Sequence, residues 1–319
     1  MRNFQRIDLT AFGGVDHLKL STIAKPELCH GEVLVKVHYS GLNPIDVKTR
    51  AGLGWAAAQK ANALPWSLGY DAAGEVVAVG QGVDCDWIGK PVCGMFGFPL
   101  EAGCYSAIRA CHINELVSVP VGVHLAQAAA LPLAGLTAYQ ALFEHGKLQS
   151  SQSVLVAGAS GGVGHIAVQL AKARGCHVVA LASAGRRETL LALGADVVLD
   201  YAQDWLAQLP NQVDLLVDLV GGDSGAHALQ AVHAEGFVVT LPTLSAERIV
   251  ETANQHDLAA TGMLVHPETE QLQEMLQLIA QGSLTIHVQD CYPAKEIGVA
   301  HQVLEEGHVA GKLLLNWRS

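Results

Sequence analysis

The clearest pattern of apolar and polar positions in this chain is a short apolar run, then glycines, then an amphipathic stretch. Residues 154–156 are valine and leucine and predict a buried strand. Apolar residues then recur at the spacing of one helix face, at Val163, Ile166, Ala167, Leu170 and Ala171, and Gly175 stands where such a helix would end. This strand, turn and helix predict a seat for a phosphate, because unpaired N–H groups and the positive end of the helix dipole meet there.

The spacing of the glycines leaves two interpretations open. Gly158, Gly161, Gly162 and Gly164 give G-x-x-G-G-x-G, whereas the strict dinucleotide fingerprint is G-x-G-x-x-G. Gly158, Ser160 and Gly162 also satisfy G-x-S-x-G, the nucleophile elbow of a serine hydrolase of the α/β class. Both sites need a strand, a sharp turn and a helix, so the local pattern does not separate them.

Later apolar runs favour the dinucleotide interpretation. Four further buried strands are predicted, at residues 178–181, 197–199, 213–217 and 237–241. Helical or polar stretches lie between them, and Gly194 stands where one such helix would end. We therefore expect a doubly wound parallel sheet that begins at the glycine strand, whereas a hydrolase elbow normally follows several strands of its own sheet. The hydrolase remains the minority alternative.

The end of the second predicted strand indicates the cofactor. NAD enzymes place an Asp or Glu about 20 residues after the glycines, on the ribose 2′-hydroxyl. Here Ser183 ends the strand, and Arg186 and Arg187 follow. Serine and arginine suit a 2′-phosphate, which a carboxylate would repel, so NADPH is favoured over NADH. The alternative is that the arginines are merely solvated at a helix start.

The segment before residue 125 has a different pattern. Val33, Val35 and Val37 alternate with other residues, 76–79 form an apolar run between glycines, and helical periods are rare. This predicts a mostly β domain with many turns.

Composition and charge bound the class of protein. At 319 residues with half of them apolar, the chain is long enough for two domains with substantial cores. The formal charge of −11 argues against nucleic acid as a partner. The start of the chain lacks a signal pattern, and the apolar window at 125–143 contains polar residues and a proline. We expect a cytoplasmic protein with no membrane partner. Seven scattered cysteines without a C-x-x-C pair fit a reducing compartment.

At this point six motifs, in order, resemble the zinc-independent quinone oxidoreductases and enone reductases of the medium-chain dehydrogenase/reductase (alcohol dehydrogenase-like) superfamily. They are Gly41-Leu-Asn-Pro-Ile-Asp46, the 68–77 segment LGYDAAGEVV, the 131–139 segment LPLAGLTAY, the glycine run with Gln169-Leu-Ala-Lys172, Leu193-Gly-Ala-Asp196 and Gly307-His-Val-Ala-Gly-Lys312. The resemblance covers nearly the whole chain and is more specific for fold than for substrate.

The resemblance implies an α/β fold of two domains. Residues 1–125 would form a GroES-like substrate domain completed by 285–319, with 312–317 as the closing strand, and 126–284 a Rossmann NADPH-binding domain. The substrate cleft would lie between them, beyond the carboxyl ends of the parallel strands.

The resemblance also implies that no metal is bound. Zinc-binding relatives have ligands at the positions of Asn43, Tyr70 and Leu133, and these side chains cannot supply a thiolate or imidazole. The region of Cys85, Cys93, Cys104 and Cys111 lacks the close spacing of a structural zinc lobe. The fifteen histidines show no H-E-x-x-H pairing.

Three catalytic candidates follow from the family motifs. Asn43 can donate to an oxyanion, Thr137 can orient the ribose or carboxamide, and Tyr70 can line the substrate pocket. The alternatives are a turn residue before Pro44 for Asn43 and a helix-interior hydroxyl for Thr137.

Three more motif positions bear on the pocket and its support. Asp46 and Asp71 are interpreted as structural carboxylates. In the resembled family many members carry a tyrosine where Gly54 stands, so that donor is missing here, and Trp55 or Trp66 is the candidate to line the pocket instead.

The expected cofactor-binding set is Asn43, Thr137, Ser160, Gly161, Gly162, Val163, Gly164, Ser183, Arg186, Arg187, Tyr201, Val220 and Leu241. The expected activity is transfer of hydride from NADPH to a small-molecule substrate, either a quinone or the β-carbon of an α,β-unsaturated carbonyl. Members of the resembled family often form dimers, so a homodimer is the candidate assembly. A serine hydrolase using Ser160, or an NADPH-binding protein without catalysis, is the alternative.

Overall fold

The computed structural model describes residues 3–318 and separates into two compact units. One unit runs through Leu136 and resumes at His266, and the other is Thr137–Val265. The expected boundaries, 125/126 and 284/285, differ from these. The difference arises because α3 (Leu125–Ala130) packs on strands of the first unit, and α9 (Thr269–Ala280) contacts the same unit through β7 (Leu116–Ser118).

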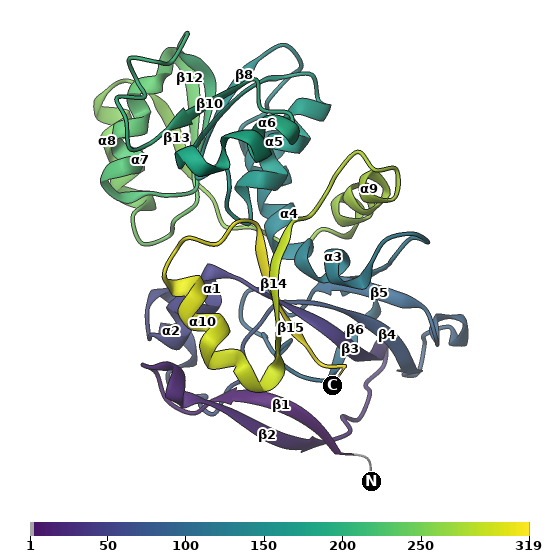
Figure 1. Ribbon diagram of the computed structural model, residues 1–319. Helices are drawn as coiled ribbons and strands as arrows, with labels where there is room; N and C mark the ends of the chain where they lie inside the picture. The colour runs from purple at the N-terminus through teal and green to yellow at the C-terminus, as the bar shows by residue number, and fades with distance from the viewer. Residues whose placement is uncertain (1–2, 319) are drawn as a thin grey trace. The chain divides into compact units, whose positions relative to one another are not determined.

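The first unit is built on a mostly antiparallel sheet. Its strand order is β14-β15-β3-β4-β5-β7, with β6 also paired to β3, and β1 and β2 form a separate hairpin (Figure 1). The strands are β1 (Asn3–Leu9), β2 (Leu18–Ala24), β3 (Glu32–Leu42), β4 (Asp71–Val79), β5 (Pro91–Met95), β6 (Ile108–His112), β14 (Val288–Pro293) and β15 (Lys312–Asn316). The expected closing strand is confirmed: β15 pairs antiparallel with β3 and parallel with β14.

The helices before residue 125, α1 (Pro44–Arg50) and α2 (Gly54–Lys60), are short, as the scarcity of helical periods in that segment predicted. Further helices of this unit lie later in the chain and are α3, the first part of α4 (Pro132–Tyr139), α9 and α10 (Ile297–Glu305). One apolar cluster packs alternating valines of β3 against β4 and β5, and a second packs the hairpin and α10 against β15. The alternation seen in the sequence therefore marks the buried face of β3.

The second unit is a doubly wound parallel sheet, as predicted. Its strand order is β10-β9-β8-β11-β12-β13, formed by β8 (Ser153–Ala157), β9 (His177–Ala182), β10 (Val197–Asp200), β11 (Val213–Asp218), β12 (Val232–Thr240) and β13 (Ala259–Gly262). Helices α5 (Gly164–Ala173) and α6 (Arg187–Ala192) lie on the side of β8 to β10, and α7 (Gly222–Ala228) and α8 (Ala246–Gln255) on that of β11 to β13 (Figure 1). Numbered from β8, the order is 3-2-1-4-5-6, that of dinucleotide-binding folds.

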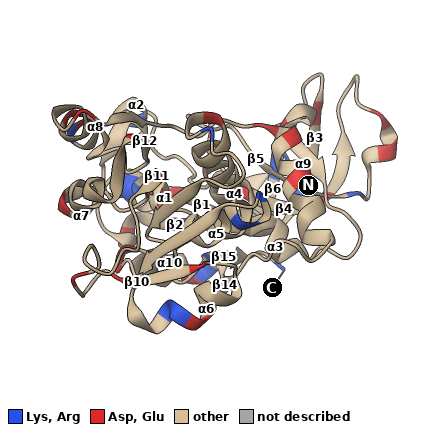
Figure 2. Cartoon of the chain, turned by 90° about the horizontal axis from the view of Figure 1, so that it is seen from above, with Lys and Arg blue, Asp and Glu red and all other residues tan. Residues whose placement is uncertain are grey.

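Charged residues are distributed over many elements of both units (Figure 2). Acidic residues outnumber basic ones, 30 Asp and Glu to 19 Lys and Arg, and in the part that the structure describes neither sign gathers on one element. None of the helices among residues 3–318 has the length and apolar character needed to cross a membrane.

Candidate active site

The predicted cofactor residues of the second unit lie at one edge of its sheet. The strand register pairs Ala157 with Leu181 and with Asp218, and Asp218 with Thr240. Because the strands are parallel, the turns that follow them emerge at the same carboxyl edge. These turns carry Ser160 to Gly164 after β8, Ser183 to Arg187 after β9, Tyr201 after β10, Val220 after β11 and Leu241 after β12.

The glycine turn after β8 has the properties of a phosphate seat. Gly158 has φ +81°, which favours glycine. A Cβ on Gly164 would lie 2.3 Å from the Gly158 carbonyl oxygen, so only glycine lets α5 start this close to the strand. Among residues 3–318, none accepts a hydrogen bond from the backbone N–H groups of Ser160, Gly162 or Val163. These free donors at the start of α5 fit a pyrophosphate.

The same topology bears on the hydrolase alternative. Strand β8 is the first strand of its sheet and lies in the middle of it, next to the point where strand order reverses. A nucleotide binds at such a switch point. The G-x-S-x-G pattern at Ser160 is thus part of a dinucleotide-type turn.

The turn after β9 carries the groups expected to meet a 2′-phosphate. Ser183 precedes a short 3₁₀ turn over residues 184–186, and Arg187 begins α6. The Arg187 Nη1 donates to the Val198 carbonyl oxygen at 2.7 Å, which ties this side chain to β10. Tyr201 follows β10 and is exposed. The edge thus presents hydroxyls and guanidinium groups, although their contact with a cofactor stays a prediction.

In the first unit, strand register gathers a second set of polar residues. Gly41 pairs with Asp71 across β3 and β4, and Leu42 pairs with Leu313 across β3 and β15. Asn43, directly after β3, therefore lies beside the first residue of β4 and the first residue of β15. Three segments that are far apart in sequence bring Asn43, Asp71 and Lys312 together.

The Asn43 side chain is bonded on both sides and is only 1% exposed. Its Nδ2 donates to Asp71 Oδ2 at 2.9 Å, and its Oδ1 accepts a hydrogen bond from Lys312 Nζ. The Lys312 Nζ also donates to the Leu42 carbonyl oxygen and lies 3.6 Å from Asp71 Oδ2. Asp71 Oδ1 accepts from the Leu133 N–H at 2.8 Å. A buried ammonium and a buried carboxylate therefore fix the orientation of the amide.

Asp46 forms a neighbouring carboxylate site. It is the third residue of α1, and its Oδ2 accepts the N–H of Asn43, the residue that caps this helix, at 2.9 Å. Its Oδ1 accepts the Gly69 N–H at 3.1 Å. Burial raises the pKa of Asp46 to about 7, and the bond from Asn43 partly offsets it. Burial also raises the pKa of Asp71 and lowers that of Lys312. The structural roles expected for Asp46 and Asp71 agree with these contacts.

Tyr70 and Thr137, the other two catalytic candidates, are both buried. The Tyr70 hydroxyl donates to the Pro99 carbonyl oxygen at 2.9 Å, and its ring packs edge-on against Phe98, as Trp55 does. Burial raises the Tyr70 pKa. Thr137 is buried on α4 at the start of the second unit. Gly54 has φ +79°, a backbone conformation in which a tyrosine would be strained.

The three positions at which zinc-binding relatives have their ligands lie close together in this chain, where they are Asn43, Tyr70 and Leu133. Asn43 and the Leu133 N–H both bond Asp71, which follows Tyr70. Across residues 3–318, no group of three or more His, Cys, Asp and Glu side chains is arranged to hold a metal ion.

Two residues of these clusters were missed as site residues by sequence reasoning. Lys312 was noted only as the end of a family motif and the start of a closing strand, and Asp218, at the end of β11, was not singled out. A carboxylate ending a buried strand before two glycines, as in Asp218-Leu-Val-Gly-Gly222, is a signal that could have drawn attention to it.

Family models and known proteins match this architecture. The chain matches the model of an alcohol dehydrogenase GroES-like domain over residues 29–134 and that of a zinc-binding dehydrogenase over 193–315. It is 38% identical over 256 residues to 2-methylene-furan-3-one reductase of Solanum lycopersicum, covering 77% of this chain and 64% of that protein. It is 32% identical to the chloroplastic NADPH-dependent alkenal/one oxidoreductase of Arabidopsis thaliana, covering 95% of this chain and 77% of that one.

Solved structures agree over the full chain. The quinone oxidoreductase of Coxiella burnetii superposes with a TM-score of 0.95 at 37% identity, covering 99% of this chain and 100% of that one. The Escherichia coli quinone oxidoreductase complexed with NADPH gives 0.85 at 27% identity, covering 98% and 99%. A GroES-like unit with a Rossmann sheet defines the alcohol dehydrogenase-like class. The chain belongs to the quinone oxidoreductase family of the medium-chain dehydrogenase/reductase superfamily.

Proposed function

We propose that this protein is an NADPH-dependent reductase that transfers hydride to a quinone or to the β-carbon of an α,β-unsaturated carbonyl compound. The observation that carries the proposal is the set of free N–H groups at Ser160, Gly162 and Val163, at the switch point of a 3-2-1-4-5-6 sheet. The NAD(P)H oxidoreductases among its relatives support the reaction type, and their names include both enone and quinone reductases.

The preference for NADPH rests on the turn after β9. Ser183, Arg186 and Arg187 supply a hydroxyl and two guanidinium groups, and no carboxylate occupies the position that would bind a free 2′-hydroxyl. The Val198 carbonyl uses one donor of Arg187, and a guanidinium has five, so others remain for a phosphate. The 2′-phosphate is therefore assigned to this turn, to Ser183 with Arg186 or Arg187.

When bound, the reduced nicotinamide supplies the hydride, and the protein supplies orientation and polar contacts. Asn43 has a second hydrogen on Nδ2 besides the one given to Asp71, and we assign this hydrogen to the substrate oxygen that becomes negative. Lys312 and Asp71 hold the amide so that its nitrogen cannot exchange places with its oxygen. Thr137 is assigned to orienting the cofactor, and Tyr70 with Phe98 and Trp55 to an aromatic wall.

The reaction is proposed to be zinc-independent. Asn43, Tyr70 and Leu133 have no thiolate or imidazole, and Asn43 and the Leu133 N–H are committed to the Asp71 carboxylate. The polar contact to the substrate is assigned to an amide, in the place where relatives use a metal.

Two further expectations belong to this proposal. A homodimer is supported by β13, an edge strand that pairs with β12 on one side and with no described strand on the other. A cytoplasmic location stays a prediction, since relatives include chloroplastic proteins.

A panel of quinones, enals and enones tests the function, with NADPH or NADH as donor and with or without prior EDTA treatment. Turnover with NADPH that survives EDTA is expected. Arg186→Ala with Arg187→Ala should remove roughly 2–4 kcal/mol of NADPH binding and leave NADH binding nearly constant. Equal losses for both cofactors would contradict the phosphate assignment. NADPH binding without turnover would favour a non-catalytic protein, and fluorophosphonate labelling that disappears in Ser160→Ala would favour a hydrolase.

A further inference from the structure

Asp218 is a fully buried carboxylate at the carboxyl end of β11. Its Oδ1 accepts the N–H of Val220 at 3.0 Å and that of Gly221 at 2.8 Å. Its Oδ2 accepts the hydroxyl of Thr240, the last residue of the neighbouring β12, at 2.8 Å. One side chain thus bonds the turn that follows its own strand and the end of the next strand.

The turns after β11 and β12 are joined at two more points. The Asp218 carbonyl accepts the Leu241 N–H at 3.0 Å, and Ser245 Oγ accepts the Gly222 N–H at 3.1 Å. Gly221 and Gly222 have φ +70° and +60°. A Cβ on Gly221 would lie 2.2 Å from Ser245 Oγ, so this close approach needs glycine. The two turns form one bonded unit, with Asp218 beneath it.

This bonded unit presents Val220 and Leu241 at the carboxyl edge. Val220 is about half exposed, unlike the buried residues of β11 before it. A Cβ placed on Gly158 would meet Val220 Cγ2 at 3.2 Å, so Val220 lies against the glycine turn. In sheets of this order, one mononucleotide half of the cofactor lies over β8 to β10 and the other over β11 and β12. The turns held by Asp218 therefore belong to the half opposite the adenosine phosphate.

We propose that Asp218 is a positioning residue: it fixes the turns that carry Val220 and Leu241 and thereby shapes the half of the site that receives the nicotinamide. The inference rests on the proposed use of NADPH. A buried carboxylate that makes three hydrogen bonds holds these turns before the cofactor binds, so no binding free energy is spent on ordering them.

The test compares two ligands by calorimetry. Adenosine 2′,5′-bisphosphate reports only on the half over β8 to β10, whereas NADPH reports on both halves. In Asp218→Ala, the Kd for NADPH should rise about 10- to 100-fold, because the turns lose their three bonds, while the Kd for the bisphosphate stays within about twofold. Asp218→Asn keeps an oxygen for the two N–H groups and a nitrogen that can donate to Thr240, and should bind NADPH within about threefold of the unchanged protein.

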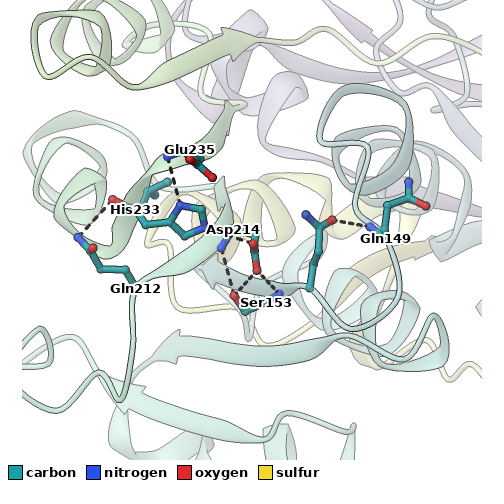
Figure 3. A network of polar contacts seen from close by, with 8 residues as sticks. Gln149, Ser153, Gln212, Asp214, His233 and Glu235 are labelled. Carbon is teal, nitrogen blue, oxygen red and sulfur yellow. Dashed lines mark hydrogen bonds and ion pairs between the residues drawn. The ribbon is translucent and has the colours of Figure 1, made fainter.

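Asp214 provides a matched control at the other end of the same strand. Its Oδ2 accepts the N–H and the hydroxyl of Ser153 at 2.7 and 2.6 Å, and its Oδ1 contacts His233 Nε2 at 3.2 Å (Figure 3). It lies at the amino edge, away from the cofactor turns. Asp214→Ala should lower the melting temperature and leave both dissociation constants unchanged.

Ser245→Ala covers the case in which Asp218→Ala does not fold. It removes two hydrogen bonds of the bonded unit, the one accepted from the Gly222 N–H and the one donated to the Pro242 carbonyl oxygen, and should raise the Kd for NADPH about 3- to 10-fold with the bisphosphate unaffected. Parallel losses of both ligands, or unchanged NADPH binding in folded Asp218→Ala and Ser245→Ala, would overturn the inference. Failure of the unchanged protein to bind the bisphosphate would instead overturn the proposed cofactor.

Discussion

Asn43 has its amide orientation set by charged neighbours rather than by its own backbone. The Lys312 ammonium has only donors and the Asp71 carboxylate, when ionised, only acceptors, so the oxygen must face Lys312 and the nitrogen Asp71. This reconciles the two interpretations of Asn43 as a turn residue and as a donor. The residue before Pro44 caps α1 through its backbone N–H, while its side chain belongs to a different set of contacts.

Asn43→Ala should lower the single-turnover rate of hydride transfer to an accepted enone by about 10- to 1,000-fold, with little change in NADPH affinity. It should also lower the melting temperature, because Lys312 and Asp71 each lose a buried partner. Lys312→Met is the matched control, since it removes a bond to Asn43 but keeps the amide.

If Asn43 is a catalytic donor, the hydride-transfer rate should fall further in Asn43→Ala than in Lys312→Met, although the melting temperature falls by a similar amount in both. An unchanged transfer rate in Asn43→Ala with a lowered melting temperature would assign Asn43 to structure alone.

Tyr105 links two buried groups whose protonation is displaced in opposite senses. Its hydroxyl lies 3.1 Å from His301 Nε2 and also bonds the Asp46 carboxyl group. Burial, helped by the charge of Arg50, lowers the pKa of His301 to about 3, whereas that of Asp46 is raised to about 7. Between pH 3.8 and 6.5 the histidine is protonated mainly in the unfolded chain, whereas the aspartate is protonated mainly in the folded chain. The two groups therefore have opposite effects on how stability changes with pH.

Replacing His301 by glutamine separates these effects. The histidine contributes stability that is fully present above pH 6.5 and is lost as the pH falls toward 3, because only the unfolded chain binds the proton in that window. The cost of His301→Gln should therefore be smaller at pH 4.5 than at pH 7.5, changing by at most about 1.4 kcal/mol per pH unit.

Urea unfolding of both proteins at intervals across this range measures that cost. Glutamine can still accept a hydrogen bond from Tyr105, which limits the packing change. A cost independent of pH would mean that His301 does not resist protonation in the folded chain.

At the scale of elements, α5 and the turn before it illustrate two different demands for glycine. Gly164 is needed for packing, since its Cβ would meet the Gly158 oxygen at 2.3 Å and the Ala159 Cα at 2.7 Å. Gly161 has no such conflict, as its Cβ would lie 3.4 Å from the nearest described atom. Its lack of a side chain instead leaves the backbone open to a ligand.

Gly164→Ala should therefore cost about 1–3 kcal/mol of unfolding free energy through overpacking against backbone. Gly161→Ala should change stability by less than about 1 kcal/mol but weaken binding of NADPH, because its Cβ occupies the approach of the phosphate. Urea unfolding and calorimetry on both variants check the separation. Similar stability losses in the two variants would contradict it.

Helices and strands could be predicted from the sequence where the local pattern of apolar residues and glycines was clear. The strands after the glycine turn were predicted within a few residues because each is a buried apolar run, and Gly175 and Gly194 do follow α5 and α6. Strand β12 begins at Val232, earlier than expected, with a shift of register against β11. Strand β13 was not predicted: Ala259-Ala-Thr-Gly262 has little strand character, and pairing with β12 determines its conformation.

At the scale of the whole molecule, the family motifs gave the two-unit fold, but they did not give the polar contacts. Lys312 lies 269 residues from Asn43, and Asp218 lies 22 residues from Thr240 on a different strand. Neither pair has a periodic signal, because sheet register brings the residues together. The free N–H groups of the glycine turn, by contrast, lie where the strand–turn–helix pattern predicted them, because that pattern is local; their binding of a phosphate stays a prediction.

The closing position of β15 has a consequence for synthesis on the ribosome. The unit Thr137–Val265 is continuous, so it can fold as soon as it has left the exit tunnel. Strand β3, by contrast, needs β15 as a neighbour, and Lys312 reaches the Leu42 carbonyl across 270 residues of chain. The first segment to be translated is therefore completed last, and nascent chains stalled before residue 312 should carry a protease-resistant central segment and a protease-sensitive amino-terminal one.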